Sequence, residues 1–220
     1  SDAFKELTKI IWDLEFAARK ALVTAQKGKL EAKGYTKLFG IDAFFEELFD
    51  HLTSTGSPWT VTLVGIGGIG KTSLANFTVR RVIEALQYHD VVWLKISELP
   101  DGERPYPTKQ TFEKLVTQLC QKMLPALSRQ TKPEERLQQL QQLLKNQPYL
   151  IIIDDLELKE DTAFLIPELV TLANPSRFLL TSRTPPAPHA GSQSIHLPEL
   201  TQEHSLALMR HCDKYIVILA

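Results

Sequence analysis

The stretch WTVTLVGIGGIGKTSLANF, residues 59–77, decides how this chain is organised. A β-rich run over residues 59–64 enters a glycine-rich loop, and a helical pattern follows from Leu74 to Leu86. From Gly65 to Thr72 the loop matches G-x-x-x-x-G-K-[ST], in the strand-to-helix context that this motif requires. Glycines let the backbone wrap an anion, and the start of the helix adds positive charge there. The stretch therefore predicts a loop that binds phosphate groups.

Side chains at the end of this loop have distinct expected roles. Lys71 should reach the β- and γ-phosphates of a nucleoside triphosphate, the Thr72 hydroxyl should bind Mg²⁺, and Ser73 should contact the α-phosphate. Backbone N–H groups of the loop should make the other contacts. The predicted phosphate-binding set is Gly65, Gly67, Gly68, Ile69, Gly70, Lys71, Thr72 and Ser73.

A second chemical feature is the run YLIIIDD, residues 149–155, which reads as a buried strand that ends in two carboxylates. Ligands of open α/β sheets bind at the carboxyl ends of the strands. We expect Asp154 to hold Mg²⁺ through water, and Asp155, or less readily Glu157, to polarise an attacking water. A helix cap or a partner for a basic side chain is the alternative role for Asp155.

The third feature is FLLTSRT, residues 178–184, an apolar strand that ends in hydroxyls and a guanidinium. Arg183 should lie at the same sheet edge and sense a γ-phosphate through charge-assisted hydrogen bonds. The alternative is a surface arginine at the end of a strand.

The other patterns alternate strands with helices, which predicts a parallel α/β sheet. Asp42 is expected to cap the helix at 43–52, and Thr201 the helix at 201–213. Pro167 should lie in the first turn of a short helix at 166–173. Further helices are expected at 74–86, 108–128 and 133–146, and strands at 59–64, 91–96, 149–153, 178–181 and 193–197, with a loop at 100–107.

The first ~33 residues read as one helix with an apolar stripe at three-four spacing. This stripe should pack on the main domain. Alternatively, the helix is the tail of an effector module or a coiled-coil contact with another copy of the chain. The stripe consists of Phe4, Leu7, Ile11, Leu14, Ala18, Ala21 and Ala25.

Composition narrows the classes of protein. The 220 residues include 25 Lys and Arg and 26 Asp and Glu, a balance that argues against a sequence-independent grip on nucleic acid. Cys120 and Cys212 have no metal-ligand spacing and are expected to be free thiols in a reducing cytosol. No apolar run approaches the ~20 residues of a membrane span, and no signal peptide is evident. We therefore expect a cytoplasmic protein, and because the chain starts at Ser1, one excised from a longer sequence.

Three segments together resemble a known family: GIGGIGKTSLA at 65–75, LIIIDDL at 150–156 and LLTSR at 179–183. They look like the signal-transducing NTPases with numerous domains, in the NB-ARC/NACHT-like branch. That group includes plant disease-resistance proteins, apoptosome scaffolds and bacterial regulators. The resemblance covers roughly residues 37–210. It implies a three-layer P-loop NTPase with a five-stranded, mainly parallel sheet of order 5-1-4-3-2, which binds ATP or ADP with Mg²⁺.

The resemblance also assigns roles residue by residue. It makes Lys71 and Thr72 the phosphate and metal contacts, Asp154 the metal carboxylate, Asp155 the catalytic acidic residue and Arg183 the first sensor. The segment LFGID, residues 38–42, sits where the family lines the adenine, which implicates Phe39 and Gly40. Ile41 and Asp42 replace the family's Arg and Glu, so the side-chain role of that arginine is absent.

The resemblance places the family's helical lid and winged-helix region beyond residue 220. His204 and His211 do not stand in for the lid histidine and are expected to be surface residues of the last helix. The predicted domains are an N-terminal helix and linker (1–36), the P-loop domain (37–200) and the start of a lid (201–220).

The resemblance implies a switch between an ADP-held closed state and an ATP-bound oligomer, with slow hydrolysis, inside a larger regulator or defence protein. Its expected partners are adenine nucleotide and further copies or flanking effector and sensor domains, with no direct nucleic acid and no membrane. A nucleotide-binding interaction module without turnover is the alternative. A P-loop kinase is disfavoured because few arginines follow the second acidic motif, and a GTPase because no Asn-Lys-x-Asp segment is present.

Overall fold

The computed structural model describes residues 2–30, 32–56, 58–98, 108–127 and 130–216, so the predicted loop at 100–107 lies outside the described residues. The helices are α1 (Asp2–Gly28), α2 (Asp42–Thr53), α3 (Lys71–Ala85), α4 (Thr108–Met123), α5 (Pro133–Asn146), α6 (Lys159–Leu172) and α7 (Gln202–Ile216), with a 3-10 turn at Ile96–Glu98. The strands are β1 (Thr60–Val64), β2 (Asp90–Lys95), β3 (Tyr149–Leu156), β4 (Arg177–Ser182) and β5 (Ser192–His196).

The five strands form one sheet in the order β2-β3-β4-β1-β5, and every pair of neighbours is parallel. Read from the other edge, this is the predicted order 5-1-4-3-2, so the expected fold is confirmed. Val64 at the end of β1 pairs with Ser182 of β4 and His196 of β5. The carboxyl ends of the strands therefore meet at one edge, where β1 runs into the glycine loop.

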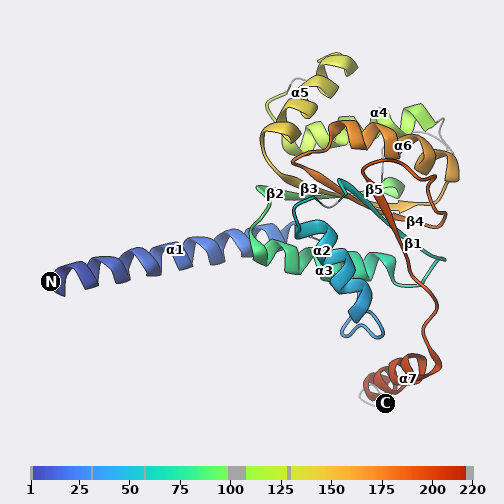
Figure 1. The fold of residues 1–220 in the computed structure, drawn as a ribbon, viewed down its shortest axis with the longest axis horizontal. Coiled ribbons are helices and arrows are strands. Elements are labelled where there is room, and N and C mark those ends of the chain that lie inside the picture. The colour runs from blue at the N-terminus through green and yellow to red at the C-terminus, as the bar shows by residue number, and fades with distance from the viewer. Residues whose placement is uncertain (1, 31, 57, 99–107, 128–129, 217–220) are drawn as a thin grey trace.

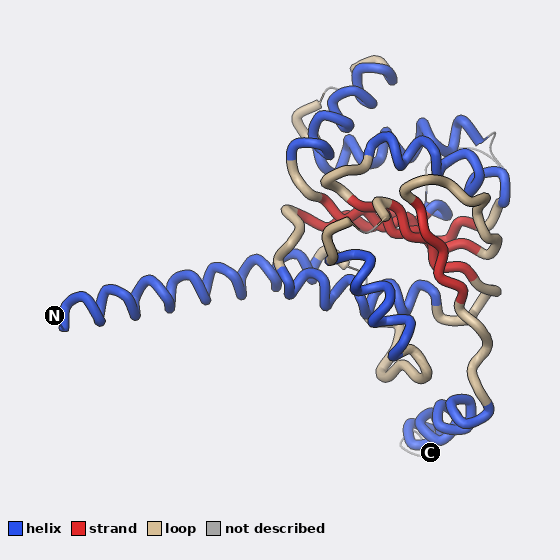
Figure 2. The backbone as a smooth tube through the Cα atoms, viewed as in Figure 1, coloured by secondary structure: helices blue, strands red, loops and turns tan. Residues whose placement is uncertain are grey.

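Helices cover both faces of the sheet, which gives three layers (Figure 1; Figure 2). One face packs against α4, α5 and α6, and the other against α2, α3 and the end of α1. Alternate residues of β3 serve the two layers: Ile151 and Ile153 point into the first cluster, and Leu150 and Ile152 into the second. All four are fully buried, which explains the uninterrupted apolar run in the sequence.

The structure tests three predictions about helix starts: two were wrong and one is confirmed. Helix α6 begins at Lys159 and not near residue 166, so Pro167 lies inside the helix and the first-turn assignment was wrong. The residue in the N-cap position of α2 is Ile41, and Asp42 lies within the first turn, so the predicted Asp42 cap was also wrong. The predicted cap of α7 is confirmed, because the backbone N–H of His204 donates to Thr201 Oγ1 at 3.3 Å.

Helix α1 leaves the body of the molecule and projects away from it (Figure 1). Only its end contacts the domain, through half-buried Val23 and buried Gln26, with Leu30 just beyond the helix. The prediction that its apolar stripe packs on the main domain was therefore wrong. Among the described residues, no helix combines the length and the apolar character that a membrane span needs.

Candidate functional site

The glycine loop joins the end of β1 to the start of α3. Gly68 and Gly70 have φ angles of +80° and +102°, which L side chains rarely adopt, so glycine is needed at both positions. Gly70 occupies the N-cap position of α3 and has no side chain that could cap the helix. The first N–H groups of α3 are thus open to an anion, as helix starts commonly are.

Lys71 extends back over the loop. Its ammonium donates hydrogen bonds to the carbonyl oxygens of Gly65 at 2.8 Å and Ile66 at 3.0 Å. Burial lowers the pKa of Lys71, and nearby Arg183 lowers it further, whereas Asp154 and Asp155 act in the opposite direction. The cation is therefore held at the loop by carbonyl groups that a more negative ligand would outcompete.

Asp154 is buried at the end of β3, with 1% of its surface exposed. One oxygen of its carboxylate accepts hydrogen bonds from Thr72 Oγ1 at 2.9 Å and Thr181 Oγ1 at 2.5 Å. The predicted pair Thr72 and Asp154 is thus brought together from the loop and from β3. Sequence reasoning missed Thr181, whose only signal was the Thr-Ser pair that precedes Arg183.

Asp155 is exposed and has a φ of +70°, an unusual conformation for a residue other than glycine. Its backbone N–H donates to Thr181 Oγ1 at 2.9 Å, and the β3–β4 register shifts between Ile153 and Leu156. The cap alternative for Asp155 is wrong, because Leu158 holds the N-cap position of α6. Strained residues of this kind cluster at functional sites.

Arg183 follows β4 and lies beside the glycine loop. Its guanidinium forms an ion pair with the carboxylate of Glu157, and about half of each side chain is exposed. A methyl group added at Gly67 would lie 3.6 Å from Arg183 Cζ. Arg183 is thus an exposed residue just after a strand end, as the alternative expected, and it also lies beside the loop and pairs with Glu157.

Two adjoining cavities share Gly68, Gly70 and Ser73. The first, of about 250 Å³, is also lined by Gly67, Lys71, Thr72, Asp155, Thr181 and Arg183. The second, of about 190 Å³, is mainly apolar, and the residues around it include Phe39, Gly40, Ile41, Ile69, Leu197, Pro198 and Leu208. The structure thus places the predicted phosphate set, apart from Gly65, around cavities that also contact Phe39 and Gly40, and sequence reasoning missed Leu197, Pro198 and Leu208.

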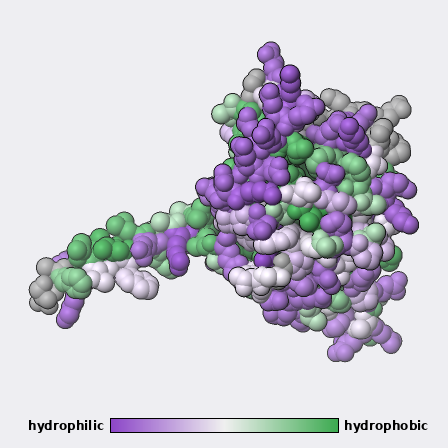
Figure 3. Space-filling model, turned by 45° about the horizontal axis from the view of Figure 1, so that its top comes forward, coloured by the Kyte–Doolittle hydropathy of each residue, from purple (hydrophilic) through white to green (hydrophobic). Residues whose placement is uncertain are grey.

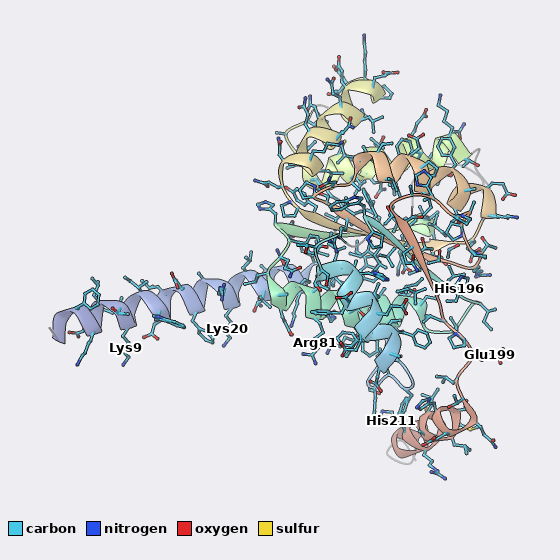
Figure 4. All side chains as sticks on the ribbon, in the orientation of Figure 1. Lys9, Lys20, Arg81, His196, Glu199 and His211 are labelled. Carbon is cyan, nitrogen blue, oxygen red and sulfur yellow. The ribbon has the colours of Figure 1, made fainter. Side chains whose placement is uncertain are left out.

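The segment before α2 contacts α7. His211 Nε2 and Thr36 Oγ1 are 2.9 Å apart, and the rings of His211 and Phe39 pack edge to face with centroids 5.6 Å apart. A Cβ at Gly40 would meet His204 Nδ1 at 2.7 Å. The two histidines, expected at the surface, therefore support the wall of the apolar cavity; Figure 4 labels His211 on α7.

A larger hollow, of about 620 Å³, lies between α4, α5 and α6. Its walls are side chains of these helices, among them Phe112, Leu137 and Phe164. It contains none of the glycine-loop residues. The cavity at the glycine loop is smaller, and it brings together Lys71, Thr72, Asp155 and Arg183.

A parallel sheet of this order, with a glycine loop between β1 and the helix that follows it, defines the P-loop NTPase fold. Two solved structures share it: the Aeropyrum pernix ORC2 protein in ADPNP-ADP complexes (TM-score 0.53, 17% identity) and Cdc6p from Pyrobaculum aerophilum (TM-score 0.59, 14% identity). Each match covers 81% of this chain, and 53% and 51% of the respective structures. At these identities the likeness shows the fold alone.

Within this fold class, the chain belongs to the NB-ARC domain family, whose pattern it matches over residues 41–213. Similar proteins from Arabidopsis thaliana include the probable disease resistance RPP8-like protein 2, 29% identical over 126 residues, and the disease resistance protein RPP8, 27% identical over 124 residues. Each match covers 56% of this chain. The chain spans 13% of the length of each relative, so it corresponds to one part of those proteins.

Proposed function

We propose that this chain binds ATP and ADP with Mg²⁺ and acts as the switch domain of a larger signalling or defence protein. The observation that carries the proposal is the meeting of Thr72 with buried Asp154, 2.9 Å apart, at the wall of the glycine-loop cavity. A hydroxyl and a carboxylate at the end of a phosphate-binding loop are the ligands expected for a nucleotide-bound magnesium ion.

The phosphates would lie in the cavity of about 250 Å³. The N–H groups after Gly70 face it, and Lys71 would exchange the carbonyl oxygens of Gly65 and Ile66 for phosphate oxygens. Its charge would then stabilise the triphosphate in a partly desolvated site.

The metal would be held by Thr72 and, through water, by Asp154. The fit rests on the donor set: oxygen ligands suit Mg²⁺, and Thr181 already orients the Asp154 carboxylate at 2.5 Å. When bound, the ion neutralises charge that develops on the phosphate oxygens.

Slow hydrolysis would depend on Asp155 and Arg183. Asp155 is exposed and lines the cavity, where its carboxylate would orient and polarise a water. Arg183 would leave Glu157 for the γ-phosphate, since a phosphate offers more negative charge than a single carboxylate. Loss of the γ-phosphate would return Arg183 to Glu157, which gives the site two states.

The adenine would fit the adjoining apolar cavity, against Phe39 and Gly40. Its wall is braced by the contacts of His204 and His211 with residues 36–40. Movement of α7 would therefore open or close this cavity and transmit the nucleotide state to other parts of the intact protein. Control of oligomerisation in the intact protein is the proposed output, and the likeness to disease resistance proteins supports a role in defence.

The test is a titration of the nucleotide-free protein with fluorescent ATP and GTP analogues in the presence of Mg²⁺. We expect ATP binding that Lys71→Ala weakens by about tenfold or more, with Lys109→Ala, an exposed lysine of α4, as the matched control. Preference for the guanine analogue, or equal affinity of both variants, would reject the adenine site.

Phosphate release then separates a switch ATPase from a binding module. We expect slow release that Asp155→Ala abolishes without loss of affinity, whereas Glu160→Ala, an exposed acid of α6, leaves it unchanged. Equal release by the wild type and by Asp155→Ala would favour the module without turnover.

A further inference from the structure

Eight large apolar side chains of α1 are exposed, and four of them lie on one line along the helix. These four side chains are between 47% and 70% exposed, although such residues are normally buried. In Figure 3 the projecting helix shows a continuous hydrophobic side. The residues at alternating three and four spacing, which we call the α1 stripe, are Phe4, Leu7, Ile11, Leu14, Ala18, Ala21, Ala25 and Gly28.

The α1 stripe stays exposed where the helix meets the domain. The residues that contact the domain, Val23, Gln26 and Leu30, lie on another side of the helix. Ala21 and Ala25 are exposed, and a Cβ added at Gly28 would meet nothing within 4 Å. The whole stripe is therefore free to receive a second helix without moving the domain.

Spacing and charge identify the kind of partner. Residues at a strict seven-residue repeat of this type form the contact line of a coiled coil. The charged residues Lys5, Lys9, Arg19 and Lys20 lie off the stripe, and Figure 4 shows Lys9 and Lys20 along the projecting helix. A partner helix with an apolar stripe of its own suits this surface.

Side-chain size along the stripe identifies the partner itself. The half far from the domain is bulky, and the half near the domain is small. If two copies of α1 lie antiparallel about a two-fold axis, every layer of contacts joins one bulky residue to one small residue. The layers are Phe4 with Gly28, Leu7 with Ala25, Ile11 with Ala21, and Leu14 with Ala18, each occurring twice.

We propose that this chain dimerises through an antiparallel coiled coil of two α1 helices, with each stripe covered by its own copy. Constant bulk across all layers keeps the two helices evenly spaced over 27 residues, roughly 40 Å. A parallel pair would place Phe4 on Phe4 and Ala25 on Ala25, so its helices would be far apart at one end and close at the other. The two domains then stand at opposite ends of the coiled coil.

One charge opposes the arrangement. Glu15 borders the stripe at its centre and would face its own symmetry mate, a like-charge pair that weakens the dimer. Glu15→Gln should therefore tighten dimerisation. The surface is separate from the nucleotide site, so the association needs no nucleotide and its test does not depend on the function proposed above.

Sedimentation of the nucleotide-free 220-residue chain tests the association. We expect a species of about twice 24.9 kDa that dissociates on dilution. Ile11→Asp should raise the dissociation constant by about 100-fold or more, because a carboxylate would be buried in an apolar contact. Phe16→Asp is the matched control: Phe16 is 70% exposed but lies opposite the stripe, so dimerisation should persist. A monomer at all concentrations, or loss of the dimer with Phe16→Asp alone, would overturn the proposal.

Disulfide trapping tests the orientation. In a Cys212→Ser background, which removes the exposed native thiol, Ile11→Cys and Ala21→Cys are prepared as separate proteins. Antiparallel pairing predicts a cross-link when the two proteins are mixed and little when either is oxidised alone. Cross-linking of each protein with itself, without a mixed product, would show a parallel pair and refute the antiparallel arrangement.

Discussion

Helices α1 and α3 share one kind of sequence pattern, but the apolar face of α3 is buried and that of α1 is exposed. Both carry apolar residues at three-four spacing. In α3 the residues at these positions are buried against the sheet, among them Ala75, Val79 and Val82, whereas Leu7 and Leu14 of α1 are more than half exposed. The pattern therefore predicts that the apolar face of a helix packs against another surface, but it does not identify that surface.

Length and connection explain the difference. The 15 residues of α3 follow β1 through a short loop and span roughly 22 Å, a length that the sheet covers. The 27 residues of α1 span roughly 40 Å and extend past the domain edge. Most of α1 therefore lies beyond any surface that this domain offers, and its stripe needs a partner from elsewhere.

The largest expected effect comes from truncating matched apolar side chains in the two helices. Ile83→Ala in α3 should lower the free energy of unfolding by about 2–5 kcal/mol, because it leaves a cavity beside the sheet. Leu7→Ala in α1 should change it by about 0.5 kcal/mol or less. Urea denaturation of dilute, monomeric protein, followed by tryptophan fluorescence, measures both.

Equal loss of stability from Leu7→Ala and Ile83→Ala in dilute protein would contradict the contrast between the exposed face of α1 and the buried face of α3. That result would mean that α1 folds back onto the domain in solution and that its stripe is covered internally.

A second prediction concerns Tyr88, which shares a buried cluster with Leu30 where α1 enters the domain. Tyr88 donates to the Leu52 carbonyl at 2.5 Å, and burial raises its pKa from 10.0 to about 12, although nearby Arg177 opposes the rise. Below pH 10 the phenol is protonated in the folded and the unfolded chain, so its contribution is complete. Between pH 10 and 12 only the unfolded chain ionises, so stability falls by about 2 kcal/mol.

Unfolding free energies at pH 9 and pH 11.5 check this loss against Tyr88→Phe, which cannot ionise. The wild type should lose more stability than the variant over this interval, while the other tyrosines and the lysines affect both proteins alike. Equal losses would mean that Tyr88 is accessible to water and that the junction is looser than the structure shows.

Much of the fold could be predicted because local chemistry determines it. The glycine loop, the apolar run of β3 and the strand that precedes Arg183 each predict both an element and its place at the sheet edge. The wrong predictions concern helix starts, which depend on contacts with other parts of the chain. The polar start of α6 hid its first turns, so Pro167 was placed too early, and Ile41 holds the cap position that Asp42 was expected to fill.

The site shows the same division. Lys71, Thr72, Asp154 and Arg183 were predicted because each belongs to a short motif. Thr181, which orients Asp154, and the contacts of α7 with residues 36–40 depend on chain segments that meet only in the folded protein. No spacing in the sequence reports such contacts, because they depend on how distant segments pack.

The smallest expected change in the free energy of unfolding concerns the end of α1, where this helix contacts the domain. Lys29, just past the end of α1, pairs with Asp90 of β2 at 2.5 Å, and 54% of the lysine side chain is exposed. Water and salt screen such a pair, so Lys29→Ala should cost about 0.5 kcal/mol or less, and the difference should vanish in 1 M salt.

Gln26 offers the contrast, because it is 3% exposed and donates to the His89 carbonyl at 3.0 Å. Gln26→Ala should cost about 1 kcal/mol and should not respond to salt, because the hydrogen bond of a buried, uncharged side chain is lost. If Lys29→Ala were the more damaging of the two, the ion pair and not the buried contact would hold α1 at the angle from which its stripe meets a second copy.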